Sequence, residues 1–178
     1  WGTVTGECKS SVTEEQIRRV IPNFTGEIEQ IPPMYSAVQK NGQRLYDLAR
    51  QGIEVEREIR KVTVYSLSLA NFDEKAQTGT LEISCSKGTY VRTIIDDIGR
   101  VLGVGAVMTA LCRTSACGFS LDECITLDEL KSICENGNVE EKLRSVESLF
   151  MSLGYLAVSS AQAKRFANGG ALSADRTY

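Results

Sequence analysis

The chain has 178 residues, of which 42% are apolar and 24% are charged, and its formal net charge is −3. This ordinary globular composition excludes a disordered or collagen-like chain, and the length suits one main domain with part of a second. No apolar run approaches the length of about 18 residues that a membrane-spanning helix needs. The chain opens on Trp1-Gly2-Thr3-Val4, without a starting Met or a secretion signal. We therefore expect it to be a piece of a longer, cytoplasmic protein.

The charge is distributed unevenly along the chain. Residues 34–118 carry 11 basic and 9 acidic side chains, whereas residues 119–150 carry 3 basic and 8 acidic ones. Residues 151–178 are again net positive, with 3 basic and 1 acidic. A polyanion would therefore meet the middle or the C-terminal part of the chain, and the acidic segment would face away from it. Ordinary solvated surface charge is the alternative explanation.

The cysteines predict neither disulfides nor a metal site. The chain has six cysteines and no histidine, and the closest pair, Cys112 and Cys117, does not have the C-x-x-C spacing of a zinc site. Without a secretion signal we expect all six to be reduced. Most lie among apolar neighbours in the sequence, which predicts small buried side chains.

Capping and turn residues predict the first elements. Thr13 and Gln16 form a capping box that opens a short helix, which ends at Pro22. Asn41-Gly42 predicts a turn, and the helical pattern that follows it ends at Gly52.

Two strands and a strongly amphipathic helix follow. Residues 61–69 and 80–87 alternate apolar and polar side chains, which predicts antiparallel strands joined through turn residues at 71–74 and 78–79. Residues 91–102 then predict a helix that ends at Gly103. Its predicted apolar stripe consists of Ile94, Ile95, Ile98, Val101 and Leu102, and its solvated face of Asp96, Asp97 and Arg100.

The remaining elements are helical. Thr126 and Glu129 form a second capping box before an acidic helix, and a last helical pattern covers residues 160–167. The order of elements predicts an α+β fold with a mixed, mainly antiparallel sheet and flanking helices.

The most promising chemical cluster lies between the second strand and the amphipathic helix. Lys87, Tyr90 and Arg92 come together there around Gly88, which permits a sharp turn into the helix N-terminus. Tyr90 could stack on a ring, and Arg92 could hold a carboxylate or a phosphate. A surface turn with a core tyrosine and a solvated arginine is the alternative.

Residues 35–60 form a second candidate, because basic and aromatic side chains alternate there in a way that suits an RNA backbone. The basic and aromatic residues are Tyr35, Lys40, Arg44, Tyr46, Arg50, Arg57 and Arg60. Interspersed acidic residues, such as Asp47 and Glu54, leave a solvated amphipathic helix equally plausible.

Three segments resemble one known family, the bacterial TruB-type tRNA pseudouridine synthases. They are FTGEIEQIPPMYSAV at 24–38, GQRLYDLARQGIEV at 42–55, and CSKGTYVRT at 85–93 with DDIG at 96–99. The resemblance implies an isomerase that converts uridine 55 of the tRNA T loop to pseudouridine without cofactor or metal, after the base is flipped out. It also implies a partial pseudouridine synthase catalytic fold.

The resemblance also implies roles for individual residues. A thumb-like insertion at residues 35–60 would grip the T arm of the tRNA through Tyr35, Lys40, Arg44, Tyr46 and Arg50. Tyr90, Leu111 and Lys87 would bind the substrate. Arg92 would pair with the catalytic aspartate and keep it ionised.

This sequence departs from the family pattern in one respect, because the family's Gly-His-Thr-Gly-x-Leu-Asp type of motif with the nucleophilic aspartate is not in it. We therefore expect residues 1–150 to be the C-terminal part of a catalytic domain, and residues 155–178 to begin a PUA-like RNA-binding domain. Alone, the chain should be inactive and should self-associate through unpaired strand edges, whereas the parent protein should be a monomer. A non-catalytic RNA-binding module and a structural domain with no RNA role are the alternatives.

Overall fold

The computed structural model describes residues 6–137 and 139–172, which form two compact units. The first unit extends to Leu111 and the second begins at Cys112. Within the described residues, no helix is both long and apolar enough to cross a membrane. The domain limits that the sequence predicts, at residues 150 and 155, stay a prediction.

The first unit is built on a three-stranded antiparallel sheet with the strand order β1-β4-β5. The strands are β1 (Gly26–Gln30), β4 (Arg60–Asp73) and β5 (Thr78–Cys85). Ile28 lies opposite Val62 in the first pair of strands, and in the second pair Leu67 lies opposite Ile83 and Leu69 opposite Leu81. The antiparallel pairing of β4 with β5 confirms the pairing that the sequence predicts for the two alternating segments.

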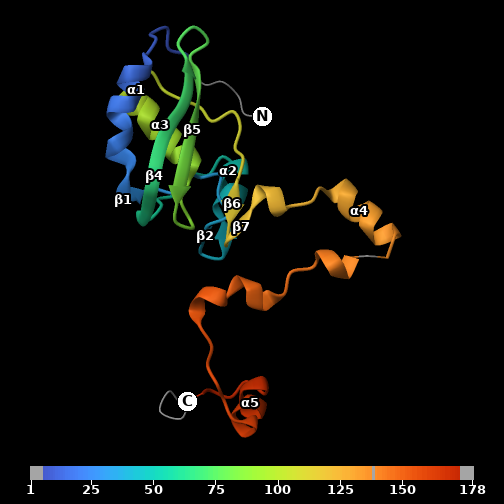
Figure 1. Ribbon diagram of the computed structural model, residues 1–178. Helices are drawn as coiled ribbons and strands as arrows, with labels where there is room; N and C mark the ends of the chain where they lie inside the picture. The colour runs from blue at the N-terminus through green and yellow to red at the C-terminus, as the bar shows by residue number, and fades with distance from the viewer. Residues whose placement is uncertain (1–5, 138, 173–178) are drawn as a thin grey trace. The chain divides into compact units, whose positions relative to one another are not determined.

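Two helices cover one face of this sheet, α1 (Glu14–Val20) and α3 (Val91–Val101) (Figure 1). A short 3₁₀ helix, η1 (Ile21–Phe24), leads from α1 toward β1. The core lies between sheet and helices, where Val64 of β4 is fully buried and Ile94 of α3 is 1% exposed. Burying such side chains removes apolar surface from water, which is the main force that holds the helices on the sheet.

The predicted capping box of α1 is confirmed, since Thr13 Oγ1 accepts from the N–H of Gln16 and the Gln16 side chain accepts from the N–H of Thr13. The first predicted strand was too short, the second was displaced by two residues toward the C-terminus, and the predicted turn was placed wrongly. β4 continues to Asp73, whose carboxylate accepts the N–H groups of Lys75 and Ala76 and so closes the turn. Residues 71–73, predicted as turn, pair with residues 78–80 instead.

The thumb (residues 35–60) contains a small hairpin and a short helix. The hairpin consists of β2 (Gln39–Lys40) and β3 (Gln43–Arg44), and Asn41 and Gly42 between them have φ angles of 52° and 80°. These angles suit a tight hairpin turn, as the Asn-Gly pair predicts. The helix is α2 (Leu45–Arg50).

α2 has two buried leucines and is tied at its start to the segment before the hairpin. Leu45 is 1% exposed and Leu48 is 8% exposed. The N–H groups of Leu45 and Tyr46 donate to the carbonyl groups of Val38 and Ser36, 2.8 and 3.1 Å away. The start of α2 is therefore fixed to the first residues of the thumb by main-chain hydrogen bonds, and its two leucines are buried.

α3 ends in a close approach of the chain to its own last turn. The carbonyl group of Gly99 accepts the N–H groups of Val104 and Gly105, and Gly99 is buried. A Cβ at this position would collide with the main chain of Gly105 and Ala106. Glycine is therefore required here by the space available, and Gly103 ends the helix as predicted.

The second unit contains short elements with mostly exposed side chains, and none of its described residues is buried. The elements are β6 (Ser115–Ala116), β7 (Phe119–Ser120), η2 (Leu121–Glu123), α4 (Leu127–Glu135), η3 (Val139–Lys142), η4 (Val146–Leu149), η5 (Met151–Leu153) and α5 (Ser160–Ala167). The predicted capping box of Thr126 and Glu129 is confirmed at the start of α4. The predicted last helix corresponds to α5.

The prediction that most cysteines are buried is wrong. All six cysteines are free, and five of them are exposed, whereas only Cys85, on the inner face of β5, is half-buried. Apolar neighbours in sequence did not become neighbours in a core, because the second unit, which carries four of these cysteines, packs few of its side chains together.

Candidate functional site

The turn between β5 and α3 is fastened to the sheet at its start. The N–H of Ser86 donates to the Thr63 carbonyl at 2.8 Å, and the Ser86 hydroxyl accepts the N–H of Thr63 at 3.0 Å. The Thr89 hydroxyl donates to the Ser86 carbonyl at 2.9 Å. Gly88 has a φ of +84°, which lets the chain reverse, and Lys87 beside it is exposed. The turn is therefore held at Ser86 and leaves the Lys87 side chain free to face solvent.

Tyr90 is the N-cap of α3 and is half-buried. Its carbonyl accepts the N–H groups of Thr93 and Ile94 in the first helical turn. The side-chain amide of Gln30, at the end of β1, bonds to both main-chain polar groups of Tyr90. Tyr90 is thus held between the helix that it caps and a strand that lies 60 residues earlier.

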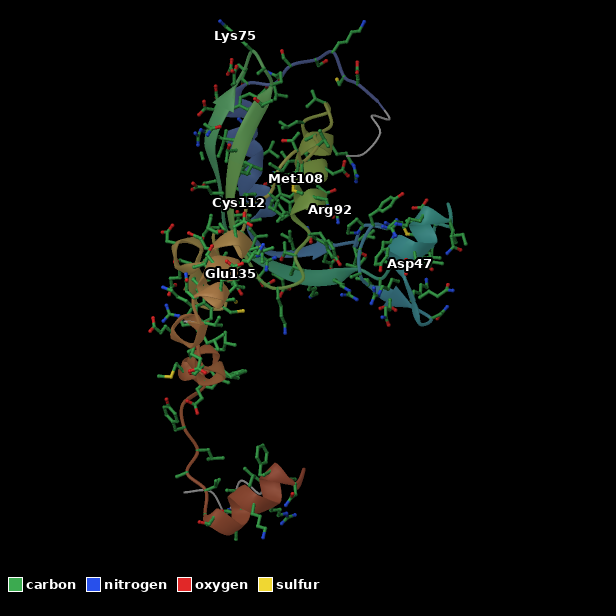
Figure 2. The ribbon with its side chains drawn as sticks, turned by 90° about the vertical axis from the view of Figure 1, so that its right-hand side faces the viewer. Asp47, Lys75, Arg92, Met108, Cys112 and Glu135 are labelled. Carbon is green, nitrogen blue, oxygen red and sulfur yellow. The ribbon has the colours of Figure 1, made fainter. Side chains whose placement is uncertain are left out.

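Arg92 lies in the first turn of α3, with its side chain directed toward the base of the thumb. One guanidinium nitrogen, Nη2, donates to the main-chain carbonyl of Tyr35 at 2.8 Å. Figure 2 shows Arg92 at the end of α3 nearest the thumb, whose helix α2 carries the labelled Asp47. The Tyr35 residue itself is 59% exposed. The structure thus brings one residue from each of the two predicted sites into contact.

A cleft of about 560 Å³ lies beside Arg92, between the start of the thumb and α3. Its lining residues are Glu29, Ile31, Pro33, Arg57, Arg92, Thr93, Asp96, Asp97 and Arg100. The carboxylates of Asp96 and Asp97 both pair with Arg100, at 2.6 and 3.4 Å. Burial raises the pKa of Asp97, against the opposing effect of the nearby Arg100 guanidinium. The cleft therefore carries both signs of charge.

Arg57, at the end of the thumb, forms one wall of this cleft, although the resemblance assigned it no individual role. Its Nη1 donates to the Pro32 carbonyl at 3.2 Å, and its Nη2 pairs with Glu54 at 3.0 Å. Its Nε is buried and has no hydrogen-bond partner within the described residues. The basic pattern of residues 35–60 contained this arginine, but spacing alone gave no sign that it would turn inward.

Three of the predicted RNA-binding residues form one cluster on the thumb. Arg44 Nη1 donates to the Tyr46 hydroxyl at 2.7 Å, and the Arg44 and Arg50 guanidinium carbons lie 5.7 and 5.3 Å from the centre of the Tyr46 ring. These are cation–π distances, and they hold two positive charges around one aromatic ring. The Lys40 ammonium donates to the Glu56 carbonyl on the other side of the thumb. The cluster combines charge and ring in the way that a nucleic-acid surface requires.

Leu111 is not brought to this site. It is 61% exposed, at the end of the first unit, and it does not line the cleft beside Arg92. A second hollow, of about 460 Å³, lies in the second unit beside α4 and is lined by residues from Ile125 to Lys142. None of the predicted site residues lines it.

Comparison with known protein families connects this geometry to an activity. Residues 1–91 match the model of the TruB family pseudouridylate synthase N-terminal domain. Residues 92–150 match the model of the tRNA pseudouridylate synthase B C-terminal domain. The chain belongs to the TruB family of pseudouridylate synthases.

Individual TruB relatives agree with this assignment. The chain is 43% identical over 172 residues to tRNA pseudouridine synthase B of Dechloromonas aromatica. This alignment covers 97% of this chain and 56% of that protein. It is 42% identical, over an alignment of 184 positions, to the protein of the same name from Lactobacillus johnsonii. That alignment covers 99% of this chain and 61% of the relative. The chain thus spans somewhat more than half the length of these relatives.

A solved structure confirms the TruB fold. The structure of a Cbf5-Nop10-Gar1 complex matches with a TM-score of 0.62 and 27% identity, over 80% of this chain and 40% of that chain. The predicted α+β fold of the pseudouridine synthases, with a mainly antiparallel sheet and flanking helices, is therefore confirmed. The roles of individual site residues stay predictions.

Proposed function

We propose that the full-length protein encoded by the gene converts uridine 55 in the T loop of tRNA to pseudouridine. The names of the relatives support tRNA as the RNA that is modified. The observation that carries the proposal is the hydrogen bond from Arg92 to the Tyr35 carbonyl. This bond joins two segments, the turn that contains Tyr90, which is predicted to contact the target base, and the first residues of the thumb. An enzyme that grips RNA and modifies one base would require such a connection.

The proposed reaction is an isomerisation. The bond between C1′ and N1 of the uridine breaks, the uracil rotates, and a bond forms between C1′ and C5. The proton on C5 is released to solvent, and N1 takes up a proton, so the reaction needs no oxidant and no co-substrate. The base must leave the stacked loop before this chemistry can occur.

We assign the roles of the site residues as follows. Arg92 pairs with the catalytic aspartate, which stays ionised because the guanidinium favours the charged form. Tyr90 packs against the flipped uracil, and Lys87 contacts the substrate. The substrate contact that the resemblance implies for Leu111 stays a prediction, because Leu111 does not line the cleft beside Arg92. Arg92 has five N–H donors, so the bond to Tyr35 leaves others for a carboxylate.

The thumb holds the T arm of the tRNA in this proposal. Tyr35, Lys40, Arg44, Tyr46 and Arg50 supply the contacts, and the cluster of Arg44, Arg50 and Tyr46 supports their role. The residues from 155 onward, which include α5, would begin a further RNA-binding domain of the PUA type.

Residues 1–178 alone should not turn over. The two aspartates that share the cleft with Arg92 are Asp96 and Asp97, and both pair with Arg100 rather than with Arg92. Neither lies in the family's Leu-Asp motif. The nucleophile would therefore come from outside this chain.

Release of tritium tests the proposal directly. A T-arm stem–loop RNA labelled with tritium at C5 of uridine is incubated with the full-length protein, and label in the solvent is counted. We expect stoichiometric release from the T arm and none from an RNA with cytidine at position 55. Release from residues 1–178 alone would contradict the assignment of the nucleophile. Binding of the T arm by the full-length protein without release would favour the alternative, a non-catalytic RNA-binding module.

A further inference from the structure

Gln30 is a polar side chain buried at the boundary between the thumb and the candidate active site. It is the last residue of β1 and is 3% exposed, one of two buried polar residues among those that the structure describes. A buried amide is costly unless its donor and acceptor are both satisfied. What Gln30 binds therefore indicates why an amide is present at this position.

Both halves of the Gln30 amide bind the same residue. Gln30 Oε1 accepts the N–H of Tyr90 at 3.0 Å, and Gln30 Nε2 donates to the Tyr90 carbonyl at 3.3 Å. The side chain therefore pairs with Tyr90 as a neighbouring strand would, by one bond in each direction. Because a main-chain N–H can only donate, the oxygen of the amide must face it, which settles the orientation of the amide.

This pairing fixes the orientation of the Tyr90 main chain where the turn after β5 enters α3. Tyr90 has an extended main chain, with φ of −96° and ψ of 98°, and its side chain offers no hydrogen bond to cap the helix. Two bonds to one rigid amide fix the orientation of the peptide groups on both sides of the residue. The Cα–Cβ direction of the tyrosine follows from that orientation, and so does the position of Arg92 two residues later.

We propose that Gln30 is a positioning residue of the pseudouridine synthase, which aligns the Tyr90 ring with the target base through the Tyr90 main chain. The inference rests on the proposed function, because it assumes that Tyr90 contacts the uracil. Gln30 also directly precedes the segment that enters the thumb. The residue thus ties the position of the ring to the start of the element that grips the RNA.

The variant Gln30→Glu supplies a test with a pH signature. A protonated carboxyl group has the same pattern as the amide, an O–H that donates and a C=O that accepts, whereas a carboxylate would repel the Tyr90 carbonyl. Burial raises the pKa of a carboxyl group, so protonation is expected within a pH range in which the enzyme can be assayed. Arg60, opposite Gln30 in the sheet, would lower that pKa, and the neighbouring Glu29 would raise it.

The full-length protein is assayed by tritium release between about pH 5.5 and 8.5, and every value is divided by that of the wild type at the same pH. We expect kcat of Gln30→Glu to be about 10- to 100-fold low at pH 8.5, since small displacements of a reacting group have effects of that size. At pH 5.5 it should return to within about threefold of the wild type. KM for the T-arm RNA should change less than threefold throughout, because Gln30 is buried and offers almost no surface for RNA to contact.

Gln77 provides the matched control. Its amide pairs with both main-chain groups of Val12, at 2.8 and 3.0 Å, in the turn at the other end of β5. Gln77 is exposed and its Nε2 also donates to the Glu74 carbonyl. Gln77→Glu therefore disturbs a pairing of the same kind at a surface position away from the site, and should leave kcat and its pH profile unchanged. Figure 2 places Lys75, in the same turn, at the far end of the sheet from Arg92.

Gln30→Met, which keeps the size of the side chain without its hydrogen bonds, is the second variant. It should lose kcat at every pH, whereas Gln77→Met should not. A pH-independent loss in Gln30→Glu, a loss confined to KM, or equal losses in the Gln77 variants would overturn the positioning role. So would Gln30 variants that unfold while their Gln77 counterparts fold. If the wild type itself releases no tritium, the proposed function fails instead.

Discussion

The guanidinium of Arg92 donates a hydrogen bond to the main-chain carbonyl of Tyr35, 57 residues earlier in the chain. The bond connects the first turn of α3 with the base of the thumb, two elements that could otherwise move independently. Because the acceptor is a main-chain atom, substitution of the Tyr35 side chain leaves it in place. Arg92 is therefore suited to link the position of the thumb to the carboxylate that we propose it holds.

Arg92→Lys tests this double role in the full-length protein. Lysine keeps the charge but lacks the planar, forked geometry that serves two acceptors at once. We expect kcat/KM for tritium release to fall about 100-fold or more, with little change in the thermal melting temperature. Arg19→Lys, at the surface of α1, should change kcat/KM less than about threefold. An Arg92→Lys enzyme as active as the wild type would contradict the role.

The thumb cluster predicts a specific salt dependence of RNA binding. Replacing both Arg44 and Arg50 with Ala removes the two charges around the Tyr46 ring. We expect weaker binding of a T-arm stem–loop, and a slope of log K against log salt that is smaller by about 0.7–0.9 for each RNA phosphate that the variant no longer neutralises. The affinity is measured by fluorescence anisotropy at several salt concentrations.

A second pair of arginines serves as the control for that experiment. Arg18 and Arg19 on α1 also lie on a short helix and pair with Glu14 and Glu15 at its surface. Their replacement with Ala should leave the salt slope of RNA binding unchanged. Equal effects of the two double substitutions would mean that the RNA responds to net charge and that it does not bind at the thumb cluster.

Gly99→Ala should destabilise the chain although helix propensity alone predicts the opposite. Alanine in a helix is favoured over glycine by about 0.5–1 kcal/mol. Here the added Cβ would collide with the main chain of Gly105 and Ala106, which flexible side chains cannot relieve. We expect the free energy of unfolding to fall by about 1–3 kcal/mol, measured by urea denaturation followed by circular dichroism.

Gly6→Ala is the corresponding control, because a Cβ at that position would meet no atom within 4 Å. Its effect should stay within about 0.5 kcal/mol. A Gly99→Ala chain as stable as the wild type would show that the loop after α3 can move away at little cost.

The carboxylate of Asp73 should add to the free energy of unfolding by an amount that is lost in acid. Hydrogen bonds from the N–H groups of Ala76 and Lys75 lower the pKa of its carboxyl group in the folded chain. The stabilisation is therefore complete above the unfolded pKa of about 3.9 and disappears as the pH falls through the lower, folded value. We expect the stability advantage of the wild type over Asp73→Asn to shrink progressively as the pH falls below about 4.

Urea denaturation at a series of pH values measures that advantage. Glu82→Gln, an exposed substitution on β5, provides the control and should give a difference from the wild type that does not follow the same course. An advantage of the wild type over Asp73→Asn that grows as the pH falls would contradict the assigned direction of the pKa shift.

Local signals in the sequence predicted the elements whose ends are set by neighbouring residues. The capping boxes at Thr13 and Thr126 and the turn at Asn41-Gly42 are formed as expected. β1 was not predicted, because GEIEQ contains a single large apolar side chain, Ile28, and acquires its strand conformation by pairing with β4. A helix stripe likewise predicted that Val101 would be buried, and it is 60% exposed.

The sequence by itself determined the family, the order of the main elements and the two segments that carry the candidate chemistry. Only the tertiary structure decided how those segments meet. It placed Gln30 against Tyr90, Arg92 against Tyr35 and Arg57 against Pro32, across 60, 57 and 25 residues. Caps and turns are held by hydrogen bonds between residues close together in the chain, so they can be predicted from the sequence. A buried amide or guanidinium forms hydrogen bonds with groups that become its neighbours only when the sheet and the core have formed.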